Sequence, residues 1–125
     1  MKVLLLNPPF LKEFSRPQRS PAVTMSGTFY FPVWLAYAAY VLDENGLEVD
    51  LVDVPADGYS IDDIIVRTKR FQPSLVILDT SMPSIYNDVT VAVQLKESFP
   101  SSFITLVGTH VSALPEETLN EYEKI

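Results

Sequence analysis

Short apolar runs alternate along the chain with stretches in which apolar residues recur at helical spacing. Four runs, at residues 2–6, 47–54, 75–78 and 103–107, have the length and composition of strands. The third is apolar at every position, as the doubly buried strands of a parallel sheet require. A proline follows Asn7 and disfavours helical geometry there, so the first strand is predicted to end at that residue.

A helix is predicted after each strand from apolar positions three and four residues apart and from residues that begin or end helices. The first starts near Pro32 and closes at Asn45-Gly46, the second begins at Ser60 with a capping box, the third uses Ser84 as its N-cap, and the fourth opens at Pro115. Residues 13–32, rich in proline and polar residues, are predicted to form one long loop.

This alternation predicts an α/β fold of the flavodoxin-like (Rossmann-like) type. Right-handed crossovers would give a doubly wound parallel sheet in three α/β/α layers, with strand order 2-1-3-4. Flavodoxin-like domains usually carry a fifth strand, which this stretch does not supply, so the fourth strand would have an open edge. Either the chain is a fragment of a longer protein or that edge pairs with another chain, in which case the fragment would self-associate.

Composition narrows the possible functions. A length of 125 residues fits a single domain. No window approaches the ~18 consecutive apolar residues of a membrane span, and no cleavage site follows the first apolar run, so we expect a cytoplasmic protein without a membrane span. The net charge of −7, without any basic run, argues against nucleic acid as a partner.

The inventory of reactive side chains is small. The chain has no cysteine, which excludes disulfides, thiolate nucleophiles, iron–sulfur ligation and cysteine–zinc sites. Its single histidine, His110, excludes a multi-histidine metal site. We therefore predict no catalytic residue and no protein metal site on this chain.

The loops that could carry a site all follow strands and therefore meet at one edge of the predicted sheet. They are Asn7-Pro8-Pro9 after the first strand, residues 79–84 after the third and residues 108–114 after the fourth. Because the strand order reverses between the first and third strands, their loops flank the crevice in which such sheets bind ligands.

One candidate for this edge is a receiver domain of the response-regulator type. Asp79 at the end of the third strand, followed by Met82-Pro83, resembles the phosphoacceptor strand of receivers. The magnesium-binding carboxylates expected after the first strand are missing, and one carboxylate would hold magnesium weakly. The alternative that stays open is a degenerate receiver-like signalling or protein-interaction domain without cofactor, in which Asp79 accepts backbone N–H bonds from the next loop.

A series of motifs over nearly the whole chain resembles the N-terminal domain of cobalamin-binding radical-SAM enzymes, and most closely that of the anaerobic magnesium-protoporphyrin IX monomethyl ester cyclase group. In chain order the motifs are residues 2–9 (KVLLLNPP), Arg16-Pro17, Ser20-Pro21, residues 31–39, residues 73–88 and residues 107–117.

The resemblance implies that residues 1–125 form a cobalamin-binding-like domain, part of a longer radical-SAM enzyme of the oxidative cyclase type. Its partners would be the corrinoid cofactor and a downstream barrel in the same polypeptide. The iron–sulfur cluster, in a Cys-x-x-x-Cys-x-x-Cys site, and S-adenosylmethionine would belong to that missing domain. A third alternative is a scaffold that packs on the barrel without retaining a cofactor.

The resemblance also implies the cofactor-binding residues. The hydroxyl and backbone groups of three loops would contact the broad, mostly apolar corrin and its amide side chains. These residues are Asn7, Pro8, Pro9, Thr80, Ser81, Ser84, Gly108, Thr109, His110 and Val111.

Two of these residues carry more specific expectations. Gly108 would let the backbone approach the ligand closely. The Asp-x-His-x-x-Gly motif that supplies a cobalt-binding histidine in other corrinoid proteins is missing after the first strand, so His110 is expected to pack or hydrogen-bond instead of ligating cobalt. Arg16 and Arg19, in the long loop, could reach over the site or toward the barrel.

Overall fold

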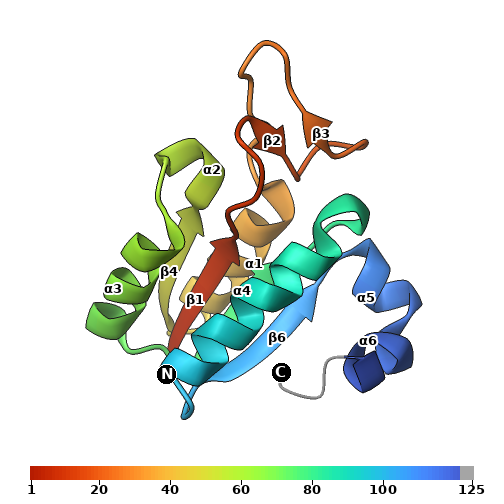
Figure 1. Ribbon diagram of the computed structural model, residues 1–125. Helices are drawn as coiled ribbons and strands as arrows, with labels where there is room; N and C mark the ends of the chain where they lie inside the picture. Colours follow the sequence, from red (N-terminus) through yellow and green to blue (C-terminus); the bar gives the residue numbers. More distant parts are fainter. Residues whose placement is uncertain (122–125) are drawn as a thin grey trace.

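The computed structural model describes residues 1–121 as a parallel sheet with helices on both faces (Figure 1). The strands are β1 (Lys2–Asn7), β4 (Glu48–Asp53), β5 (Leu75–Asp79) and β6 (Phe103–Val107). Their order is β4-β1-β5-β6 and all neighbouring pairs are parallel. This confirms the predicted flavodoxin-like arrangement and the order 2-1-3-4.

The predicted helices are present, and several shorter elements were not predicted. The four predicted helices are α1 (Val33–Glu44), α3 (Ile61–Phe71), α4 (Ile85–Ser98) and α6 (Pro115–Glu121). The additional elements are β2 (Phe14–Ser15), β3 (Ala22–Val23), α2 (Val54–Asp57), the 3-10 turn η1 (Met82–Ser84) and α5 (Thr109–Ala113).

The two faces of the sheet are covered unequally. Helices α3 and α4 lie on one face, and the core beneath them includes Leu6, Leu78 and Leu95, all fully buried. Helix α1 lies on the other face, where Leu35 packs against Val3 and Leu5. The sheet is therefore the middle of three layers.

Two of the expected helix ends are confirmed. Ser60 and Asp63 form a complete capping box at the start of α3. Gly46 follows α1 with φ of 79°, and its N–H and that of Leu47 donate to carbonyls of the last turn. Local sequence was sufficient to predict both ends.

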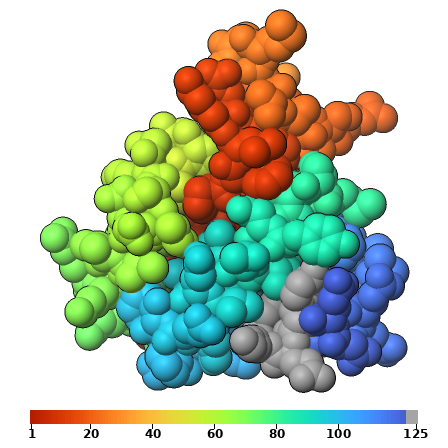
Figure 2. Space-filling view, in the orientation of Figure 1, coloured from red at the N-terminus to blue at the C-terminus, as the bar shows by residue number. Residues whose placement is uncertain are grey.

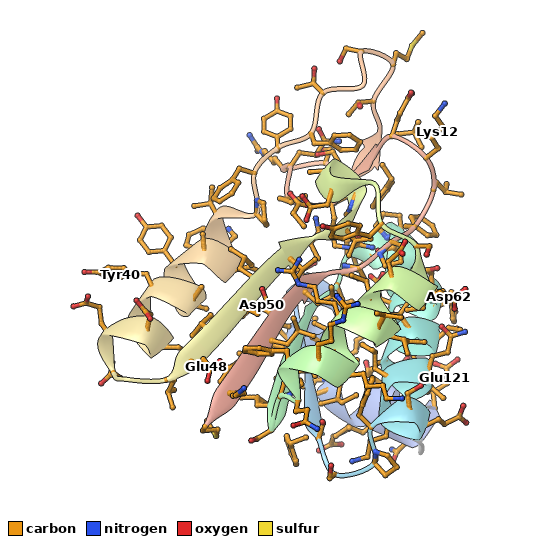
Figure 3. The ribbon with its side chains drawn as sticks, turned by 90° about the vertical axis from the view of Figure 1, so that its left-hand side faces the viewer. Lys12, Tyr40, Glu48, Asp50, Asp62 and Glu121 are labelled. Carbon is orange, nitrogen blue, oxygen red and sulfur yellow. The ribbon has the colours of Figure 1, made fainter. Side chains whose placement is uncertain are left out.

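Residues 8–32, here called the arm, leave the carboxyl end of β1 and return to α1. The predicted long loop contains the β2–β3 hairpin, in which Phe14 pairs with Val23. The hairpin stands beyond the end of the sheet and projects from the body of the molecule (Figures 1 and 2). Met25, which follows β3, is exposed. Lys12 lies in the arm just before β2 (Figure 3).

Strand β6 has β5 as its one strand neighbour within residues 1–121. Phe103 on this strand is 69% exposed. Self-association through this edge stays a prediction. No helix in the described part of the chain is long and apolar enough to cross a membrane.

Candidate functional site

The predicted site residues lie at the carboxyl edge of the sheet in two neighbouring groups. The first surrounds the ends of β1 and α4 and contains Asn7, Pro8, Ser81 and Ser84, all buried, with Pro9 half-buried. The second surrounds the ends of β5 and β6 and contains Thr80, Gly108, Thr109, His110 and Val111.

The crevice between β1 and β5 is occupied by the side chain of Arg16, which is 3% exposed. Its Nε donates to Ser84 Oγ at 3.3 Å, its Nη2 to Asp88 Oδ1 at 2.7 Å, and its Nη1 to the Pro8 carbonyl at 2.8 Å and to Asn7 Oδ1. One guanidinium therefore ties the arm to the end of β1 and to the start of α4.

Asp88 is the anionic centre of this network and is fully buried. Besides Arg16, it accepts from Ser84 Oγ at 2.6 Å and from the Ser81 N–H at 3.2 Å. Burial raises the pKa of the Asp88 carboxyl, and the Arg16 charge and the Ser84 hydrogen bond oppose that shift. Both oxygens of this carboxylate therefore accept hydrogen bonds: Oδ1 from Arg16 and Asn87, and Oδ2 from Ser81 and Ser84.

Ser84 occupies the N-cap position of α4, but the predicted side-chain cap was wrong. Its hydroxyl makes no cap hydrogen bond to the helix backbone. Instead it donates to the Asp88 carboxylate one turn later, a charge-assisted hydrogen bond, and contacts Ser81 Oγ.

Two further carboxylates lie near Arg16 without pairing with it. Asp53 accepts from Asn7 Nδ2 at 2.8 Å, and burial raises its pKa against that hydrogen bond. Burial raises the pKa of Asp79 to about 6; the Arg16 charge opposes the shift and the Asp88 charge adds to it. Within residues 1–121, no group of three histidine or acidic residues is placed to hold a metal ion.

Glycine is required at position 108 for a structural reason that was not predicted. Its φ is 140°, and a Cβ at this position would collide with the carbonyl and hydroxyl oxygens of Thr80. Thr80 in turn donates from Oγ1 to the Val107 carbonyl at 2.9 Å. The close backbone approach seen here is between two loops of the domain, and an approach to a ligand stays a prediction.

Helix α5 carries the remaining predicted residues to the surface. Thr109 is exposed, and His110 and Val111 are half-buried. This helix follows β6, so its first turn lies two strands along the sheet from β1. The two groups of site residues thus form a floor and an outer rim.

A separate cleft of about 420 Å³ opens at the same end of the sheet, between the arm and α2. Aromatic and apolar residues dominate its lining, among them Phe10, Phe29, Pro55 and Tyr59. The carboxyl end of the sheet therefore has a filled crevice on one side of β1 and an open, apolar cleft on the other.

Comparison with protein families identifies this architecture. The model of the B12-binding domain matches residues 19–125. The chain belongs to the B12-binding domain family. That membership decides against the receiver-like alternative, and the predicted cobalamin-binding class of domain is confirmed at this level.

One curated relative of the B12-binding domain is an uncharacterized methyltransferase from the archaeon Pyrococcus horikoshii. It is 31% identical over 121 residues, which are 97% of this chain and 24% of the relative. The chain thus spans about a quarter of the length of that relative. No solved structure matches it.

The residues of the outer rim have the chemistry to contact a corrinoid. Those of the inner crevice are already occupied with one another. Thr109, Val111 and the Gly108 turn offer hydroxyl, apolar and backbone groups at the surface. The inner residues Asn7, Ser81 and Ser84 already use their side-chain polar groups within the Arg16 network. Their direct contact with cofactor stays a prediction.

The sequence pointed to Arg16 as a loop residue but did not predict that it would lie at the centre of a buried hydrogen-bond network. Asp88 was not predicted as a site residue. Asp88 lies on α4 three residues after Ile85 and four before Ala92, both buried. A carboxylate on an apolar helix face needs a buried partner, and that pattern was the available indication.

Proposed function

We propose that this B12-binding domain holds the corrinoid cofactor of a larger cobalamin-dependent radical-SAM enzyme. The family match over residues 19–125 carries the proposal. The methyltransferase relative supports a longer polypeptide, because about three quarters of it lies outside the matched region. In that polypeptide a separate barrel would bind the iron–sulfur cluster and S-adenosylmethionine, since this chain has no cysteine to ligate a cluster.

Methyl transfer is the reaction we favour for the whole enzyme, because the relative is named a methyltransferase. Oxidative cyclisation of magnesium-protoporphyrin IX monomethyl ester is the second candidate, supported by the series of motifs from KVLLLNPP to residues 107–117. Bound cobalamin would supply a cobalt centre able to carry a methyl group.

The contribution of this chain would be binding and orientation. Thr80, Thr109, His110, Val111 and the Gly108 turn would contact the corrin and its amide side chains at the rim. The inner residues Asn7, Pro8, Pro9, Ser81 and Ser84 would form the floor beneath it. His110 would pack or hydrogen-bond without ligating cobalt.

Binding is tested by mixing the domain with hydroxocobalamin and following co-elution in gel filtration together with the corrinoid absorption spectrum. We expect co-elution at micromolar concentrations and a shifted spectrum. Thr109→Trp should block binding, whereas Ser101→Trp, a matched change of an exposed residue at the other end of the sheet, should not. Absence of binding at high micromolar cobalamin would favour the scaffold that lacks a cofactor.

The role of His110 is tested in the cob(II)alamin state by electron paramagnetic resonance. The proposal predicts no nitrogen hyperfine splitting from the protein, and the same spectrum for His110→Ala. A splitting present in the wild type and lost in the variant would assign His110 to cobalt.

The coding sequence that follows Ile125 tests the second half of the proposal. Cysteines at the spacing Cys-x-x-x-Cys-x-x-Cys would support a radical-SAM partner in the same polypeptide. A stop codon at that point would contradict it.

A further inference from the structure

The Arg16 network joins parts of the chain that are far apart in sequence. Arg16 belongs to the arm, and its contacts reach Asn7 nine residues away and Asp88 72 residues away. The side chains of the ion pair are 1% and 0% exposed. The position of the loop after β1 and that of the turn before α4 thus depend on one side chain.

The network is saturated as well as buried. Ser81 Oγ contacts Ser84 Oγ, Ser84 Oγ donates to Asp88, and Arg16 has a partner at each of its three nitrogens. A fully satisfied buried network is rigid, whereas removing one partner leaves an uncompensated buried charge. Opening the crevice would therefore be strongly unfavourable, because it would leave the Asp88 carboxylate buried without its cation.

The position of the network conflicts with a ligand that inserts between the strands. Arg16 fills the crevice where the strand order reverses, the usual ligand position in such sheets. The polar groups left for a ligand are on the outer side, at α5 and the Gly108 turn, or on the arm.

We propose that Arg16 is a positioning residue of the cofactor site: it keeps the crevice between β1 and β5 closed and fixes the loops that follow them, so that a corrinoid lies across their outer surface. The inference rests on the proposed function. Arg16 does not contact the cofactor; it acts through the turn that carries Ser81 and Ser84.

The test replaces the ion pair without leaving a buried charge. Apolar residues of similar volume often preserve the fold when they replace a buried pair, so the Arg16→Met, Asp88→Leu double variant should fold. Without the polar network its loops lose their fixed positions, and we expect the Kd for hydroxocobalamin to rise about tenfold or more, about 1.4 kcal/mol or more. A fold checked by circular dichroism with unchanged affinity would overturn the proposal.

A matched control uses the second Arg–Asp pair of the domain. Arg67 donates to both carboxylate oxygens of Asp50, at 2.8 and 2.6 Å, between α3 and β4. The Arg67→Met, Asp50→Leu variant should bind hydroxocobalamin as the wild type does. A loss equal to that of the Arg16 pair would show that the effect is general destabilisation, and would overturn the proposal.

Two further measurements decide the matter if the double variant fails to fold. Arg16→Lys keeps the charge but cannot serve Asp88, Ser84 and Asn7 together, so it should fold and bind cobalamin more weakly than the wild type. In the wild type, the Arg16 Nε–H resonance should stay protected from exchange when hydroxocobalamin is added. Loss of that protection on binding would show that the crevice opens, contrary to the proposal.

The outcomes separate this inference from the proposed function. A wild type that binds no cobalamin overturns the proposed function and this inference with it. A wild type that binds, together with a double variant that binds equally well, overturns only the role of Arg16.

Discussion

The two arginine–aspartate pairs of this domain have nearly the same length and very different surroundings. Arg16 and Asp88 lie 2.7 Å apart with side chains 1% and 0% exposed. Arg67 and Asp50 lie 2.6 Å apart with side chains 41% and 17% exposed. The distance between the charged atoms alone therefore says little about what an ion pair contributes to stability.

Their positions explain the difference in role. Asp50 lies in the middle of β4 beside α3 (Figure 3), so the Arg67 pair joins two elements that the apolar core already holds together. The Arg16 pair joins the arm to α4. Within the arm Phe14 is buried and packs edge-to-face against Phe10, whereas Leu11, Val23 and Met25 are exposed. The buried pair therefore anchors to α4 a region in which several apolar side chains are exposed.

The largest loss of unfolding free energy is expected when the buried Arg16–Asp88 pair is broken. Arg16→Ala leaves Asp88 buried without its cation, and such changes cost about 3–5 kcal/mol of unfolding free energy. Urea unfolding at pH 7.5 measures this loss, and it should shrink at low pH, where Asp88 can take up a proton. A loss below about 1 kcal/mol would contradict the comparison, because it would match an exposed pair.

A smaller effect is expected at Asp79, which lies near Arg16 without a direct pair. Because burial raises its pKa to about 6, the folded state binds the proton more tightly than the unfolded chain does, and this group costs stability as pH rises from about 4 through 6. Asp79→Asn removes that cost, and since water still reaches the group we expect a gain on the order of 1 kcal/mol at pH 8.

The pH profile supplies the control for Asp79. Thermal unfolding of the wild type and Asp79→Asn should differ at pH 8 and converge toward about pH 3, where Asp79 is mostly protonated in both states. A difference that does not change with pH would assign the effect to packing and not to charge.

The smallest effect is expected from the exposed pair. Arg67→Ala should cost less than about 1 kcal/mol, and added salt should reduce even that, since screening weakens exposed charges. The Arg16 pair, shielded from solvent, should respond little to salt. The losses of unfolding free energy in Arg67→Ala and Arg16→Ala are measured by urea unfolding at low and high ionic strength. An equal dependence of both losses on salt would contradict the difference drawn between the two pairs.

The sheet was predictable because its determinants are local. Each strand is a short apolar run, each long helix has an apolar face, and the capping residues Ser60 and Gly46 lie where their helices begin and end. Short elements such as α2 and the β2–β3 hairpin escaped prediction, since two to four residues carry too little periodicity to identify them.

The gathering of the predicted loops at one edge of the sheet was predictable, and the contacts among their side chains were not. Strand ends located the loops that hold Asn7, Thr80 and Gly108, but a contact between Arg16 and Asp88 spans 72 residues and leaves no local pattern. Ser84 occupies the N-cap position of α4 as predicted, but its hydroxyl donates to Asp88 four residues later and makes no cap hydrogen bond.

The most direct test of the account is a titration of the labelled domain with hydroxocobalamin, followed by backbone amide resonances. The account predicts that the perturbed amides gather at residues 80–84 and 108–111, with the amino end of the sheet unchanged. Perturbations confined to that other end, around the cavity lined by Ile65, Lys69 and Ser101, or no perturbation at all, would contradict it.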